Sequence, residues 1–93
     1  MFVGTCVISL RAEWVSTLKE KRMVVKSIVE KAKHKFNISI AEVDSNDVHQ
    51  TIVIGFACVS NRISHVDDTI ETVIGFIENN TDAVICDIER DVI

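Results

Sequence analysis

The segment FVGTCVISLRA, residues 2–12, alternates between two kinds of side chain. Its even positions are the more apolar and carry Phe2, Gly4, Cys6, Ile8, Leu10 and Ala12, whereas threonine, serine and arginine occur among the odd positions. A period of two is typical of a β-strand that buries one face and exposes the other. We therefore predict a strand here whose even-numbered residues point into the core.

Two longer segments repeat their apolar residues at helical spacing. The first has Ser16 or Thr17 as its cap and runs to about residue 35, with apolar side chains every three or four residues. Glu20 follows Thr17 by three residues, which is the pattern of a capping box. A second segment, over about 61–80, has the same spacing. Both segments are predicted to be α-helices.

Three β-rich runs complete the chain, over residues 37–44, 48–60 and 83–92. The sequence Asp-Ser-Asn-Asp at 44–47 favours a turn, so the first two runs are predicted to form a hairpin. The alternation of the first run shifts phase between Ile40 and Ala41, which predicts a β-bulge there. The expected inner face of the last run is formed by Val84, Cys86 and Ile88.

The element order β-α-β-β-α-β is that of the ferredoxin-like fold, an α+β architecture. In this fold both helices cover one face of an antiparallel sheet whose strand order is 4-1-3-2. A chain of 93 residues has room for one hydrophobic core. Residues 1–93 are therefore predicted to form a single ferredoxin-like domain.

The second face of such a sheet has no helix over it. We expect this open face to present the apolar residues Val3, Val7, Val53, Ala57, Val59 and Ile85. A contiguous apolar patch of this kind is unusual on the surface of a monomer. The sequence therefore predicts a homodimer, or a larger homo-oligomer, that assembles through the open face.

The composition indicates where the protein works. No apolar run approaches the roughly 20 residues of a membrane span, and no secretory leader is visible, so we expect a cytoplasmic protein that does not contact a membrane.

The chain has an odd number of cysteines, which lie far apart and fall within predicted strands: Cys6, Cys58 and Cys86. This pattern indicates three buried, reduced thiols.

The sequence contains no constellation that would support catalysis. The glycines are scattered and form no phosphate-binding loop, and no nucleophile stands in a recognisable catalytic motif. His34, His49 and His65 lie in separate predicted elements, without the spacing of metal ligands. We therefore expect a protein that is not an enzyme and that uses neither a metal nor another cofactor.

Charge is distributed unevenly along the chain. Residues 1–36 contain eight basic and three acidic residues, whereas residues 37–93 contain two basic and eleven acidic residues. On a helical wheel at about 100° per residue, one side of the first helix carries Lys19, Arg22, Lys26 and Lys33. We call these four residues the basic stripe. Such a stripe could bind the phosphates of a nucleic acid or an acidic protein surface.

Two plainer explanations of the basic stripe remain open. Its lysines could simply solvate an exposed helix face while their stems cover apolar surface. The carboxylates that could neutralise it within the subunit are Asp44, Asp47 and Asp82.

Lys21 differs from the stripe because its wheel position falls inside the apolar arc of the helix. It would either extend past the end of the sheet to water or hold an anion or an interface carboxylate.

Residues 16–28, STLKEKRMVVKSI, resemble the YlxP-like family of small bacterial proteins, whose signature is close to S-L-K-x-K-R-x-V-V-K-S. The resemblance covers essentially the whole chain, since it continues at residues 36–44, Val59-Ser60-Asn61, His65-Val66 and Asp87-Ile88-Glu89-Arg90. Thr17 departs from the pattern, because the family commonly has serine directly before leucine. Val48-His49-Gln50 also departs, at a place where the family often shows Leu-Trp-Gln.

The resemblance implies a ferredoxin-like fold and a link to translation, usually suggested to be ribosome maturation. Together with the uneven charge, it leads to the hypothesis of a non-enzymatic accessory protein that binds ribosomal RNA or a ribosome-assembly partner. The contacts would come from the basic stripe and Lys21. Base stacking on the sheet is not expected, because its central strands present no aromatic residue on the open face. The alternative is a homodimeric protein-interaction or small-ligand regulatory module assembled through the open face.

Overall fold

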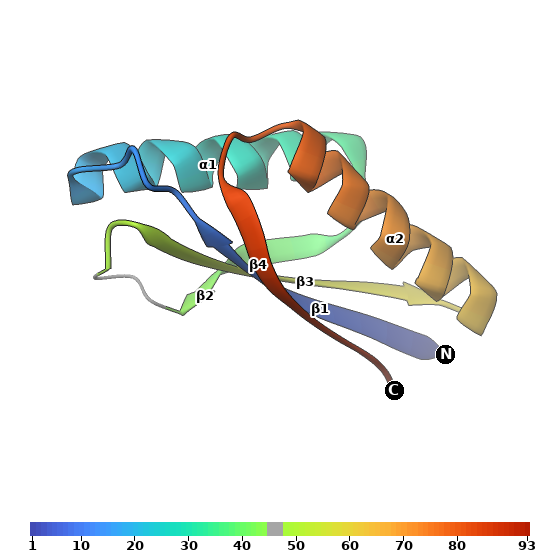
Figure 1. Cartoon of the computed structure of the whole chain (residues 1–93). Helices are drawn as coiled ribbons and strands as arrows, with labels where there is room; N and C mark the ends of the chain where they lie inside the picture. Colours follow the sequence, from blue (N-terminus) through green and yellow to red (C-terminus); the bar gives the residue numbers. More distant parts are fainter. Residues whose placement is uncertain (45–47) are drawn as a thin grey trace.

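The computed structural model describes residues 1–44 and 48–93, and it has the predicted element order β-α-β-β-α-β (Figure 1). The elements are β1 (Phe2–Arg11), α1 (Leu18–Lys35), β2 (Ser39–Asp44), β3 (Thr51–Ser60), α2 (Ile63–Asn79) and β4 (Val84–Val92). Strand β3 begins at Thr51 rather than at residue 48, whereas the other bounds agree with the predictions within two residues. The predicted turn at 44–47 lies largely outside the described residues.

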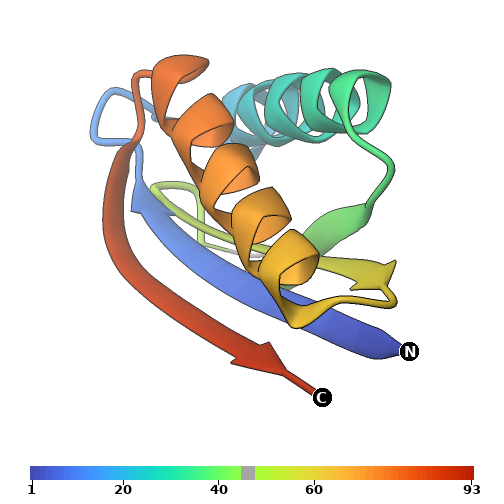
Figure 2. The same cartoon turned by 90° about the vertical axis from the view of Figure 1, so that its right-hand side faces the viewer.

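A single antiparallel sheet supports the fold. Its strand order is β2-β3-β1-β4, which is the predicted 4-1-3-2 order read from the opposite edge. Figure 2 shows α1 and α2 on the same side of this sheet, as the ferredoxin-like architecture requires. Among the described residues, no helix covers the other side, so the predicted open face is present.

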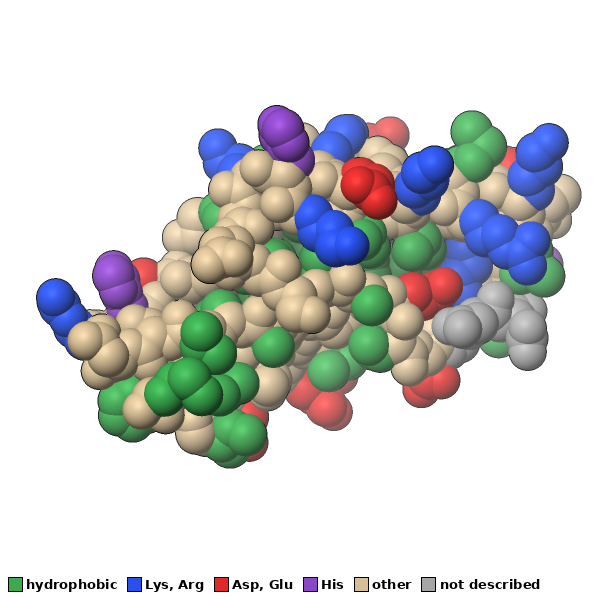
Figure 3. Space-filling model, turned by 180° about the vertical axis from the view of Figure 1, so that it is seen from behind, with side chains coloured by type: hydrophobic (Ala, Val, Ile, Leu, Met, Phe, Trp, Pro, Cys, Tyr) green, Lys and Arg blue, Asp and Glu red, His purple; other side chains and the backbone are tan. Residues whose placement is uncertain are grey.

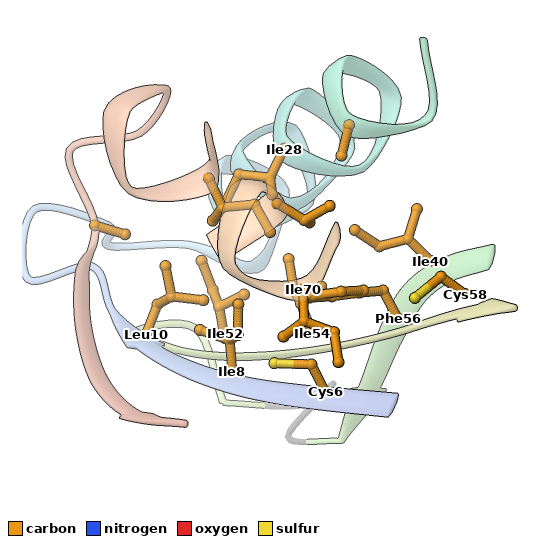
Figure 4. Close-up of a cluster of buried hydrophobic side chains, with 14 of the residues drawn as sticks. Cys6, Ile8, Leu10, Ile28, Ile40, Ile52, Ile54, Phe56, Cys58 and Ile70 are labelled. Carbon is orange, nitrogen blue, oxygen red and sulfur yellow. The ribbon is translucent and has the colours of Figure 1, made fainter. Parts of the chain in front are cut away.

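The core lies between the sheet and the two helices (Figure 4). The even-numbered residues of β1 point into it, as predicted, with Cys6 and Leu10 standing opposite Phe56 and Ile52 of β3. Helix α2 contributes Ile70, which is completely buried. Burying an aliphatic side chain of this size contributes about 1.5–3 kcal/mol. The alternation in β1 therefore supplies apolar side chains to the face that the helices cover.

Helix α1 begins at the predicted capping motif. Thr17 is its N-cap, and the Thr17 hydroxyl accepts a hydrogen bond from the backbone N–H of Glu20 at 3.1 Å. The Glu20 carboxylate in turn accepts hydrogen bonds from the hydroxyls of Ser16, at 2.7 Å, and Thr17, at 3.4 Å. A side-chain cap satisfies one of the free N–H groups of the first turn and is worth about 1 kcal/mol. The local sequence therefore sets where α1 starts.

The predicted faces of β4 are wrong in part, because the strand carries a register shift. Its pairing with β1 shifts between Ser9 and Leu10, which leaves Cys86 as an extra residue in β4. Ile85 consequently stands opposite Leu10 on the helix side and packs against the core, not on the open face where it was expected. Cys86 and Val84 are exposed rather than inward-facing. The expectation of three buried thiols therefore fails for Cys86.

Strand β2 also carries an irregularity, but not at the predicted place. Its register with β3 shifts between Glu42 and Asp44 and leaves Val43 as the extra residue, whereas the alternation predicted a bulge between Ile40 and Ala41. Glu42 lies on the helix side of the sheet before this shift. Its carboxylate therefore points toward α1 and is available to a group on that helix.

Gly4 and Gly75 offer a matched test of the packing between β1 and α2. A Cβ atom on Gly4 would overlap Val66 Cγ1 and approach Ile70 Cδ1 to 3.0 Å, whereas a Cβ atom on Gly75 would meet nothing within 4 Å. We expect Gly4→Ala to lower the free energy of unfolding by about 1–3 kcal/mol through overpacking. Gly75→Ala should raise it by about 0.5–1 kcal/mol, because alanine favours the helix. Urea denaturation of both variants measures the difference, and equal effects would contradict the tight contact at Gly4.

Candidate functional site

The basic stripe lies on the outer side of α1. All four of its residues are exposed: Lys19, Arg22, Lys26 and Lys33. In Figure 3, Lys and Arg side chains follow α1 along the top of the molecule. Within residues 1–44 and 48–93, no ion pair joins any of the four to a carboxylate. The described structure therefore gathers these predicted cations on one surface without neutralising them.

The carboxylates that could have neutralised the stripe are placed elsewhere or lie outside the described ranges. Asp82 borders a shallow hollow beside Trp14 and Met23. Asp44 ends β2, and Asp47 falls in the undescribed segment. Among the described side chains, Asp82 forms no ion pair with a residue of the stripe. An ion pair between Asp82 and the stripe is thus absent from the described part of the chain.

Lys21 leaves the helix surface and enters the core. Its side chain is only 2% exposed, so the expected alternative in which it extends past the end of the sheet to water is wrong. The ammonium donates a hydrogen bond to the Val48 carbonyl oxygen at 2.8 Å and lies 3.0 Å from Glu42 Oε2. That oxygen receives no well-directed hydrogen bond from the described residues, so its contact with Lys21 is mainly an attraction between charges. The ammonium is therefore held within the subunit.

The Lys21 contacts tie three segments of the chain together. Lys21 belongs to the first turns of α1, Glu42 to β2, and Val48 to the segment that precedes β3. A buried charge is stable only where it is paired and hydrogen-bonded, so these contacts constrain how α1 sits on the hairpin. Lys19 and Arg22 lie in the same turns of α1 as Lys21. The contacts of Lys21 therefore also fix where these two residues lie relative to the hairpin. Lys21 itself is not part of the exposed cationic surface.

Negative charge gathers on the opposite side, along β4. Asp87, Glu89 and Asp91 stand opposite outward-facing residues of β1 and so point to the open face. Arg90 points to the helix side instead, where it pairs with Asp67 and Glu71 of α2. Cations over α1 and anions beside the open face give the molecule two electrostatically different sides. A polyanion would be attracted to the first side and repelled from the second.

The open face carries five of the six apolar residues predicted there: Val3, Val7, Val53, Ala57 and Val59. Val59 is 62% exposed, and the other four are half-buried. A hollow of about 290 Å³ lies over Gly55, where Val43 and Ala57 form part of its border. Figure 3 shows hydrophobic side chains gathered at the lower left, at the end of the molecule where the N terminus lies. The open face therefore combines these five apolar residues with the carboxylates of β4.

A larger hollow, of about 500 Å³, lies between the C-terminal half of α1 and the end of α2. We call it the interhelical groove, and its border is formed by Glu30, Lys31, His34, Lys35, Phe76 and Asn80. The Phe76 and Phe36 rings meet edge to face, with centroids 5.3 Å apart and an interplanar angle of 87°. The Lys35 ammonium lies 5.9 Å from the Phe76 ring centroid. Sequence reasoning missed this groove, because its two sides are far apart in the chain.

No arrangement typical of metal binding is present in the described part of the chain, where no group of three or more His, Cys, Asp and Glu side chains converges. Burial raises the pKa of the Cys6 and Cys58 thiols, which reduces the fraction of reactive thiolate at neutral pH.

Among the described helices, none is long and apolar enough to cross a membrane. Three surfaces are the candidate sites: the stripe, the open face and the interhelical groove.

These features define a class of protein, a small ferredoxin-like α+β domain with a cationic helix and an open, apolar sheet face. The chain belongs to the family described as "Protein of unknown function (DUF503)", whose sequence profile matches residues 3–90. It is 36% identical over 63 residues, 68% of each chain, to "Uncharacterized protein YlxP" of Bacillus subtilis (strain 168). The resemblance to YlxP-like proteins is thus confirmed.

A likeness among solved structures extends over nearly the whole chain. The "De novo designed protein Foldit4" matches with a TM-score of 0.52, covering 99% of this chain and 94% of that one. The sequence identity is 13%. The likeness is therefore one of fold alone, and it agrees with the ferredoxin-like arrangement of the sheet and helices.

The Lys21 contacts predict a strong dependence of stability on this one side chain. Lys21→Met should lower the free energy of unfolding by about 2–4 kcal/mol, because it leaves the Glu42 carboxylate near the core without its cation. Adding Glu42→Leu should recover part of that loss, since the unpaired charge is then removed. Urea denaturation of the two single variants and the double variant gives their coupling energy. Strictly additive losses would show that Lys21 and Glu42 do not act as a pair.

Proposed function

We propose that this protein is a non-enzymatic accessory factor that binds ribosomal RNA, or a ribosome-assembly or translation partner, through the basic stripe. The observation that supports the proposal is a row of four exposed cations that pair with no carboxylate among the described residues. The protein as a whole has a net charge of −4, so the stripe is a local exception to its overall charge. Such an exception favours a partner with negative charge.

The length of the stripe suits a polyanion with regularly spaced charges. Lys19 and Lys33 are separated by fourteen residues of one helix, or about 21 Å along its axis at about 1.5 Å per residue. Phosphates of a nucleic acid release counterions when Lys and Arg neutralise them, and this release supplies much of the affinity. The stripe therefore provides affinity for a phosphate backbone without reading its sequence.

The remaining charges orient the protein on such a partner. Asp87, Glu89 and Asp91 on the open face would be repelled by phosphates, so the protein would bind with α1 toward the RNA and β4 away from it. The buried Lys21 ammonium contributes indirectly, because it holds the first turns of α1 on the hairpin. In this proposal Lys21 is a positioning residue and the four exposed cations make the contacts.

Charge reversal in the stripe tests the proposal. Lys19→Glu/Arg22→Glu/Lys26→Glu should abolish salt-sensitive binding to ribosomal subunits or to a structured RNA. The wild-type log–log dependence of affinity on salt should have a slope of about −3 to −4, as expected for about four phosphate contacts. Fluorescence anisotropy across a salt series measures both, and circular dichroism checks that the variant is folded.

A matched pair of single variants controls for net charge. Arg22→Glu changes the stripe, whereas Arg62→Glu makes the same charge change at the start of α2, away from α1. Only Arg22→Glu should weaken binding by several-fold. Equal weakening by the two variants, or wild-type binding that ignores salt, would contradict a site on α1.

A second candidate function is a homodimeric protein-interaction or small-ligand regulatory module, in which two copies meet through their open faces. It is favoured by the exposed side chain of Val59 and by the depression over Gly55, which could accept an apolar side chain of the other copy. The carboxylates of β4 would have to lie at the outer margins of such a dimer to avoid repulsion. Salt would screen that repulsion, so the dimer should persist where RNA binding weakens.

Sedimentation equilibrium tests the dimer. The wild-type protein should show a monomer–dimer equilibrium that Val59→Lys shifts toward monomer by at least about tenfold, since it places a charge in an apolar contact. Ile63→Lys is the control, because Ile63 is also exposed but lies at the start of α2. A wild-type protein that stays monomeric at high concentration would rule out this assembly.

A further inference from the structure

We infer that the interhelical groove binds an unpaired nucleotide of the same RNA, with the base against Phe76 and the adjoining phosphate at Lys31 and Lys35. The inference rests on the proposed function and names the kind of RNA that this surface would prefer. It assigns a base-stacking role to an aromatic residue on the helix layer. Such a role was not expected from the sequence, because the open face of the sheet presents no aromatic side chain.

The geometry of Phe76 suits a stacking platform. Its ring is half-buried, makes an edge-to-face contact with Phe36, and borders an open hollow of about 500 Å³. The group over the ring is the ammonium of Lys35, whose side chain is exposed. An exposed lysine can leave the ring when a base arrives and can then pair with the phosphate of the same nucleotide.

The charges around the groove favour a nucleotide and indicate its orientation. Lys31, His34 and Lys35 provide hydrogen-bond donors on the α1 side, and Asn80 adds an amide on the α2 side. Glu30 is the acidic member of the border and would repel a phosphate placed next to it. The phosphate is therefore assigned to the Lys31 and Lys35 end. A base stacked on the Phe76 ring could form hydrogen bonds through its polar edge with the surrounding donors and the carboxylate. Its phosphate would pair with the lysines.

The groove and the basic stripe lie on the two flanks of the same exposed helix surface. On the helical wheel, the stripe residue Lys33 lies about 100° from the groove residue His34 and about 160° from the groove residue Lys31. A helix with its side chains is only about 10–12 Å across. An RNA that contacts the stripe and crosses the outer side of α1 would bring an adjacent unpaired nucleotide to the groove.

Two RNAs separate this inference from the proposed function. One is a blunt twelve-base-pair duplex, and the other is the same duplex with a four-nucleotide single-stranded 3′ extension. We expect the wild-type protein to bind the extended RNA at least about fivefold more tightly than the blunt one, as one stacked base would provide. Phe76→Leu should remove this preference and leave binding to the blunt duplex unchanged. The variant Lys19→Glu/Arg22→Glu/Lys26→Glu should weaken binding to both RNAs.

Three further variants guard against an effect on folding. Phe76→Tyr keeps the ring and should retain the preference, whereas Lys31→Gln/Lys35→Gln changes only exposed side chains and should reduce it. Trp14→Leu removes an exposed aromatic residue outside the groove and should have no effect. Equal affinity of the wild type for the two RNAs, with the stripe still required, overturns the groove inference alone.

The other outcomes are equally decisive. Failure to bind either RNA overturns both the groove inference and RNA as the partner of the stripe. A peptide rich in glutamate and phenylalanine is the competing occupant. If this peptide binds more tightly than the extended RNA, and Phe76→Leu abolishes its binding, then the groove takes an acidic peptide and the inference is wrong.

Discussion

The handedness of the two β-α-β crossovers is the constraint on which the rest of this structure depends. Strands β1 and β2 run parallel to each other, as do β3 and β4, because each pair is separated by one antiparallel neighbour. Crossovers between parallel strands of one sheet are almost always right-handed. The two connections run in opposite directions across the sheet and join strands of opposite direction, so both helices fall on the same face. One face is thereby covered, and the other is left open.

The surfaces of the molecule follow from this arrangement. Helix α1 buries Ile28 and Ala32 against the sheet and turns its basic stripe outward, while α2 lies beside it and leaves the interhelical groove between them. Strand β4, at one edge, presents its carboxylates to the open face. Charged residues on an edge strand also discourage pairing with the edges of other sheets. The cationic side, the groove and the apolar face are therefore products of one topology.

Lys21 is the place where the helix layer and the hairpin depend on a polar contact rather than an apolar one. A methionine at this position would fill a similar volume without a charge. Packing alone therefore does not require a lysine here. Replacing a buried ion pair by apolar residues is often neutral or stabilising, and such a pair is therefore weak evidence for stability. Its contribution is directional, because the ammonium must reach both Glu42 and the Val48 carbonyl oxygen. That requirement sets the orientation of the first turns of α1, and with it the position of the stripe.

Local sequence alone determined the elements, their order and the architecture. The period of two in residues 2–12, the capping pattern at Thr17 and Glu20, and the helical spacing beyond them all act between near neighbours in the chain. The exposed stripe and the anomaly of Lys21 follow from the same helical period. Tertiary structure decided the rest. The bulges at Val43 and Cys86, the partners of Lys21 and the groove at Phe76 depend on which residues of distant segments meet. A one-residue shift in strand pairing exchanges the two faces of a strand, and periodicity within that strand carries no information about its partner's register.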